Sequence, residues 1–190
     1  KVFGEGGNLG MTQRGRIEFC LNGGLCNTDF IDNAAGVDCS DHEVNIKILL
    51  NKQVAAGQLS RADRNDFLAS MTEAVAELVL HNNARQTQAI SLAVHRSEQQ
   101  HAEYQRFMGW LEESGRLDRE LEFLPTDDQL NERVNRNQPV WTRPELSVLV
   151  CYSKVMLKEA LMEADLVSEH WLAKSLNNAF PAELIKRYGP

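Results

Sequence analysis

Glycine is distributed very unevenly along this chain of 190 residues, because eight of its 12 glycines lie within the first 36 residues. Glycine adopts backbone conformations that other residues avoid and lets a ligand or another backbone approach closely, but it weakens helices and strands. The first forty residues are therefore expected to be rich in loops. The rest of the sequence is free to form regular structure.

Beyond residue 40, apolar residues recur with the spacing of amphipathic helices. Ser40 and Asp41 are good helix-capping residues, so a helix is expected over residues 41–56, with Gly57 ending it. The same signals predict further helices after Ser60 with an apolar face to Val79, over residues 85–113, over residues 127–134, from Thr142 to about Leu161, and after Pro181. The apolar stripe behind Thr142 predicts that this helix is long and buried.

The charge balance and hydropathy exclude two classes of partner. The chain has 20 basic and 27 acidic residues, a formal net charge of −7, and no basic cluster interleaved with aromatics, which argues against nucleic acid. The longest apolar run, residues 146–153, is far shorter than the roughly 20 residues that a membrane span requires. Neither a membrane span nor a signal peptide is expected, and a cytoplasmic location is predicted.

The residue types of metal sites and nucleophilic sites are present but poorly arranged. The spacing of the histidines and cysteines matches no metal motif, so no metal site is expected. The four cysteines, Cys20, Cys26, Cys39 and Cys151, are interpreted as reduced thiols that pack in the interior. Consecutive Cys39, Ser40, Asp41 and His42 contain the residue types of a nucleophilic triad, but neighbours in sequence do not converge as a triad must.

The sequence Lys1-Val2-Phe3 is typical of the end of a buried strand that leads into the glycine-rich residues 4–10. One strand is not stable without a sheet, so we expect the chain to begin inside a domain whose other strands lie upstream. The predicted fold is mainly α. A strand-loop-helix remnant of a doubly wound α/β dinucleotide-binding domain (residues 1–56) precedes an all-helical C-terminal domain (residues 57–190).

Two segments at this end are candidates for ligand binding. Residues 4–10 match neither the dinucleotide fingerprint nor a P-loop, and they suit either an ordinary tight turn or close approach of a ligand. Residues 33–43 are small and polar and are expected to enter a helix N-terminus, where free N–H groups favour an anion such as a carboxylate. Ser40 or Asp41 then serves as the helix cap, as a ligand of the anion, or as both.

Taken together, these segments resemble a known family, the large bacterial NAD-specific glutamate dehydrogenases. The resemblance rests on residues 4–8 (Gly-Glu-Gly-Gly-Asn), residues 27–37 and residues 40–43 (Ser-Asp-His-Glu), and it continues in residues 71–76 and 142–149. It implies reversible oxidative deamination of L-glutamate to 2-oxoglutarate and ammonium, with NAD as cofactor and with upstream domains of the same chain. An intact member is expected to be a homo-oligomer.

The resemblance also implies roles for individual residues. Gly7, Asn8 and Asn33 are expected to face the nicotinamide part of NAD, Ser40 to bind the substrate carboxylate, and Val37 to pack beside it. Smaller glutamate dehydrogenases usually carry alanine at the position of Gly7 and glycine at that of Ala35.

The reaction needs a lysine and an acid to manage protons at the amine carbon, and no glycine-flanked lysine motif is present. No catalytic residue is therefore assigned here, and the chain alone is expected to be inactive. The alternative is a helical regulatory or oligomerisation module without a catalytic role.

Overall fold

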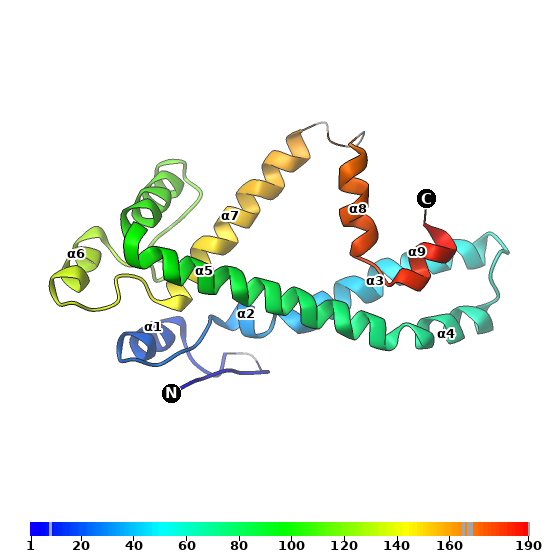
Figure 1. Ribbon diagram of the computed structural model, residues 1–190, viewed down its shortest axis with the longest axis horizontal. Helices are drawn as coiled ribbons and strands as arrows, with labels where there is room; N and C mark the ends of the chain where they lie inside the picture. The colour runs from blue at the N-terminus through cyan, green and yellow to red at the C-terminus, as the bar shows by residue number, and fades with distance from the viewer. Residues whose placement is uncertain (8, 165, 167–168, 190) are drawn as a thin grey trace. The chain divides into compact units, whose positions relative to one another are not determined.

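The computed structural model describes residues 1–7, 9–164, 166 and 169–189. These residues form nine helices joined by loops (Figure 1), namely α1 Gln13–Leu21, α2 Asp29–Asp32, α3 Ala34–Ala55, α4 Arg61–Ser70, α5 Thr72–Glu113, α6 Asp127–Asn135, α7 Arg143–Glu163, α8 His170–Asn178 and α9 Ala182–Tyr188. The prediction of a mainly helical chain is confirmed. No helix in this described part is both long and apolar enough to cross a membrane.

The predicted N-terminal strand is wrong. Within the described residues, Val2 forms a single isolated parallel bridge with Leu25, in which Phe3 N–H donates to Leu25 O and Leu25 N–H donates to Lys1 O, both at 2.9 Å. Val2 is also 80% exposed rather than buried. One bridge does not extend into a sheet without further strands, so the strand remnant of an α/β domain is not seen in this part of the chain.

Three helical segments lie where loops were expected, namely α1, the short α2 and the first turns of α3. Helix α1 begins at Gln13, directly after its N-cap residue Thr12, whose Oγ1 accepts a hydrogen bond from Gly15 N–H at 3.2 Å. Helix α3 begins at Ala34 instead of Asp41, because the alanines after α2 support helix and the single glycine at position 36 is tolerated. The high glycine content of this region was therefore a weaker signal than local capping and alanine.

The local start and stop signals further along the chain are confirmed. Ser60 caps α4 by accepting from Asp63 N–H at 3.1 Å. Gly57 and Gly115 follow the ends of α3 and α5 with φ of +71° and +69°, which glycine adopts without strain. The break between α4 and α5 falls at Met71, earlier than expected, and α5 has a non-helical residue at Gln100 (φ −122°, ψ 31°).

Helix α7 has the predicted start but not the predicted burial. Glu145 reaches back to accept from both Thr142 N–H and Thr142 Oγ1 at 2.8 Å, and residues 144–149 are buried. In the second half of the helix, Leu157 and Leu161 are 59% and 46% exposed. Spacing correctly identified a helix, but it did not reveal that its second half lacks a covering layer in the described structure.

The chain divides into two compact units, each discontinuous in sequence. Unit 1 comprises Lys1–Asn33 and Gln86–Glu163, and unit 2 comprises Ala34–Arg85 and Ala164–Pro190. The buried core of unit 1 gathers residues of α5, α6, α7 and the loops between them: Ala93, Met108, Leu111, Leu117, Leu124, Leu130, Trp141, Leu146, Val148 and Leu149. That of unit 2 contains Ile46, Leu50, Leu59, Met71 and Leu184. These units are defined by contacts within the chain, whereas the predicted boundary near residue 56 separates two domains of a longer protein. The division into units therefore does not test that boundary, which stays a prediction.

Candidate functional site

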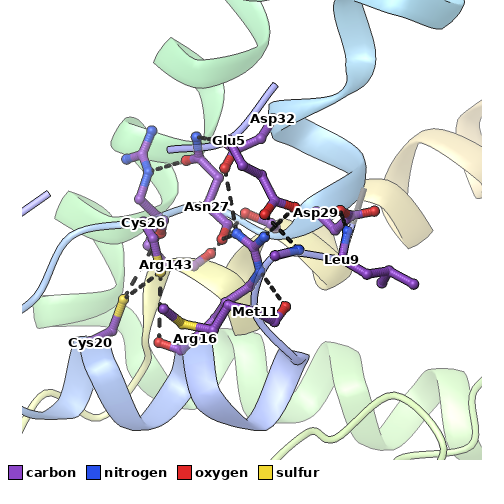
Figure 2. Close-up of polar contacts among 12 residues, drawn as sticks. Glu5, Leu9, Met11, Arg16, Cys20, Cys26, Asn27, Asp29, Asp32 and Arg143 are labelled. Atoms are coloured by element: carbon purple, nitrogen blue, oxygen red, sulfur yellow. Dashed lines mark hydrogen bonds and ion pairs between the residues drawn. The ribbon is translucent and has the colours of Figure 1, made fainter. Parts of the chain in front are cut away.

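The N-terminal part of unit 1 is built around one fully buried arginine, Arg16 of α1 (Figure 2). Its Nη2 lies 2.7 Å from Glu5 Oε1, and its Nη1 lies 3.4 Å from Asp32 Oδ2. The guanidinium also donates to the carbonyl oxygens of Met11 (3.1 Å) and Asn27 (2.9 Å). Burying a charge is costly unless it is paired and hydrogen-bonded, and here two carboxylates and two carbonyls supply that compensation.

A second group of polar contacts joins this cluster to α5 and α7. Asn27 Nδ2 donates to Asp32 Oδ1 at 2.9 Å, and Asn27 Oδ1 accepts from Arg143 Nε at 2.5 Å (Figure 2). Arg143 also donates to Ser91 Oγ at 2.9 Å and to Thr87 O at 3.0 Å. Burial lowers the pKa of Arg143. Asn27 is thus fixed both by its neighbour Asp32 and by Arg143, which lies 116 positions away in the sequence.

The glycine-rich segment, residues 4–10, is fastened to this cluster on both sides of its tip. Glu5 Oε2 accepts from Gly10 N–H at 2.7 Å, while the same carboxylate pairs with Arg16. Leu9 N–H donates to Asp29 Oδ1 at 2.8 Å, and this bond is the main reason that the pKa of Asp29 is lowered. Glu5, Leu9 and Gly10 of this segment are therefore held by specific contacts.

Gly7 and Asn33 are two of the three residues expected to face the cofactor. Gly7 is exposed at the tip of this loop, a Cβ atom there would meet nothing within 4 Å, and its φ is not positive. Neither crowding nor conformation requires glycine at position 7 in this chain, so alanine would fit. Asn33 follows α2, and its N–H donates to Asp29 O at 2.9 Å, so Asp29 is bonded to both Leu9 and Asn33. Asn8 lies outside the described residues.

Val37 and Ser40, the expected substrate residues, lie three positions apart on α3, within unit 2. Both are exposed. The expectation that Ser40 stands at a helix N-terminus is wrong, because α3 begins six residues earlier at Ala34. The free N–H groups of that N-terminus belong to the first turn, so Ser40 offers a carboxylate its hydroxyl alone.

The nucleophilic and thiol chemistry considered from the sequence finds no support in the geometry. His42 is buried, with Nε2 3.7 Å from Asp38 Oδ1, whereas Ser40 and Asp41 are exposed. The Sγ atoms of Cys20 and Cys26 are buried 3.6 Å apart, and burial together with the Cys20 contact raises the pKa of Cys26 to about 12. A thiol with such a pKa stays protonated and unreactive, in agreement with a packing role for this pair. Cys151 is partly buried but Cys39 is exposed, so the interpretation of all four cysteines as interior thiols is wrong for Cys39.

Sequence reasoning missed Arg16, Asp32 and Arg143, which hold the site together. The one available signal was the pattern of Thr12 followed by Ile17 and Cys20, which marks a capped helix and places Arg16 beside its buried positions. Among the described residues, no group of three or more His, Cys, Asp or Glu side chains is placed to hold a metal ion.

Comparison with known proteins identifies the family to which the chain belongs. Residues 1–93 match the family model for the catalytic domain of bacterial NAD-glutamate dehydrogenase, and residues 139–190 match the model for the C-terminal part of glutamate dehydrogenase. The chain belongs to the family of bacterial NAD-specific glutamate dehydrogenases.

Three relatives carry that family name. The chain is 57% identical to the NAD-specific glutamate dehydrogenase of Pseudomonas aeruginosa over 189 residues, 52% to that of Halomonas elongata over 188, and 40% to that of Mycobacterium tuberculosis over 190. These matches cover 99–100% of the chain but 12% of each relative. No solved structure matches the chain.

Proposed function

We propose that the chain is part of an NAD-dependent glutamate dehydrogenase, which converts L-glutamate, NAD and water into 2-oxoglutarate, ammonium and NADH. The observation that carries this proposal is the 57% identity to an NAD-specific glutamate dehydrogenase over the whole chain. The chain spans 12% of that relative, so the activity belongs to a longer protein. We place this enzyme in the cytoplasm and expect it to be a homo-oligomer, which light scattering of the full-length protein tests.

NAD, when bound, accepts a hydride from the α carbon of glutamate. We assign Gly7, Asn8 and Asn33 to the nicotinamide side. The open space around the backbone of Gly7 supports this assignment, because a flat ring can approach a backbone that no side chain covers. Arg16 is a positioning residue, since its ion pair with Glu5 fixes the loop that carries Gly7.

We assign the substrate carboxylate to Ser40, with Val37 packing beside it. The exposure of both side chains on α3 is compatible with contact to a ligand. The lysine and the acid that move protons at the amine carbon are assigned to sequence outside these 190 residues. The 190-residue chain alone is therefore expected to oxidise no glutamate.

Steady-state kinetics of the full-length enzyme test these roles. Ser40→Ala should weaken glutamate binding by about 1–3 kcal/mol, the usual loss for a hydrogen bond to a charged group, and leave the constant for NAD unchanged. Asn33→Ala should do the reverse. Ser40 is exposed within α3, so alanine there removes no cap and should not lower stability.

An unchanged glutamate constant in Ser40→Ala would refute the substrate assignment. Glutamate oxidation by the 190-residue chain would refute the placement of the proton-transfer groups elsewhere. Absence of NAD-dependent glutamate oxidation in the full-length protein would refute the function itself.

A further inference from the structure

Helix α3 has apolar residues on two opposite faces. On one face, His42, Ile46 and Leu50 are buried and contribute to unit 2. Val37, Val44 and Ile48 form a second stripe, which we name the outer face of α3. At 3.6 residues per turn, these three positions lie roughly 160–200° around the helix from Ile46. They are 62%, 50% and 52% exposed.

One exposed apolar residue on a protein surface needs no explanation, but an aligned stripe does. A helix that borders solvent normally has one apolar face and an opposite polar face. Helix α4 of the same unit follows this rule, since its exposed positions are polar residues and alanine. Helix α3 instead has the pattern of a helix that lies between two packed layers, of which the described residues supply one.

The matched regions of the family indicate what the second layer is. Helix α3 lies entirely within residues 1–93, the part that matches the catalytic-domain model. The chain amounts to 12% of each relative's length, so most of a relative's sequence has no counterpart here. Val37 belongs both to the outer face and to the residues assigned to the substrate, which joins this surface to the catalytic part of the protein.

We propose that the outer face of α3 is the surface on which the remainder of the catalytic domain packs. The exposed carboxylate of Asp41 lies within the stripe, four residues after Val37 and three before Val44. The docking surface is therefore apolar, with a cation or hydrogen-bond donor opposite Asp41, because a carboxylate buried without such a partner is strongly unfavourable. The proposal rests on the proposed function only in placing the chain within a longer enzyme.

Thiol labelling of the 190-residue chain and of the full-length protein tests this surface. Val44→Cys and Ile48→Cys are made separately in a Cys39→Ser background, and labelling by a maleimide is followed at each site by peptide mass spectrometry. Asp66→Cys on α4 is the matched control, since Asp66 is an exposed polar position of the same unit. We expect all three sites to react at similar rates in the 190-residue chain. In the full-length protein the rates at 44 and 48 should fall at least about tenfold, while that at 66 stays the same.

Equal rates at 44 and 48 in both proteins would overturn the proposal. Protection within the 190-residue chain that increases with its concentration would also overturn it, because the occupant would then be a second copy. Hydroxyl-radical footprinting of unsubstituted Val44 and Ile48 makes the same comparison if a cysteine variant does not fold. Labelling does not depend on turnover, so loss of the proposed activity and loss of the proposed contact are separate results.

Discussion

The N-terminal 33 residues of unit 1 and the α3–α4 region of unit 2 are stabilised by different kinds of contact. Around Arg16, stability comes from ion pairs and hydrogen bonds that converge on one buried charge. Around Leu50, it comes from apolar side chains that exclude water together. Removing one partner from the polar cluster leaves the other charges unpaired. In the apolar core, the loss of stability instead increases gradually with the side-chain volume that is removed.

The largest effect expected from this contrast is that of Arg16→Met. The substitution keeps an apolar stem but leaves Glu5 and Asp32 without their cation, and breaking a buried pair typically destabilises by about 3–5 kcal/mol. Urea unfolding followed by circular dichroism measures the loss in free energy of unfolding. Arg14→Met is the matched control, because Arg14 is exposed and contributes mainly its stacking over Phe123 at 5.0 Å, worth about 0.5–1 kcal/mol. Equal losses for the two variants would show that the buried cluster contributes no special stability.

Leu50→Ala tests the apolar side of the comparison. Leu50 is fully buried in unit 2, so its truncation should lower the free energy of unfolding by about 2–5 kcal/mol, according to how far the site collapses. Ile48→Ala, two positions away on the outer face of α3, should change it by less than about 1 kcal/mol in the 190-residue chain. The same unfolding experiment compares the two, and a larger loss at Ile48 would mean that its face is already covered.

The smallest effect expected is an acid-dependent loosening of the glycine-rich loop. The pKa of Asp29 is held below its ordinary value of 3.8, mainly by the hydrogen bond from Leu9 N–H. Because the folded pKa is below the unfolded one, this contribution is complete above pH 3.8 and is lost as the pH falls through the folded value. NMR titration of the Leu9 amide should show a step in that acidic range. Asp29→Asn should abolish the step, and a step that survives this substitution would assign it to another group.

Local signals in the sequence were enough to place many element boundaries. Ser60 and Thr142 were recognised as helix starts, and Gly57 and Gly115 as helix stops, because capping depends on residues within one turn. The start of α3 was misplaced, since the cap types Ser40 and Asp41 lie inside a helix that had already begun.

The architecture of the candidate site was not accessible in this way. The bond between Asn27 and Arg143 joins residues 116 positions apart, and no periodicity indicates such a contact. The assignments of Asn33 and Ser40 came from resemblance to a family, which gives roles but no geometry. Spacing likewise identified the apolar residues of α7 without showing which of them are covered.

The second half of α7 has a consequence for the behaviour of the chain in solution. Val155 and Met162 lie on one side of the helix, Leu157 and Leu161 lie on roughly the opposite side, and all four are about half exposed or more. Mutual repulsion between molecules that each carry a net charge of −7 opposes association through such a surface at low ionic strength. The Debye length falls from about 10 Å at 0.1 M salt to about 3 Å at 1 M, so added salt removes this protection while the apolar attraction persists. We therefore expect the solubility of the 190-residue chain to decrease as salt is added, although its fold does not change.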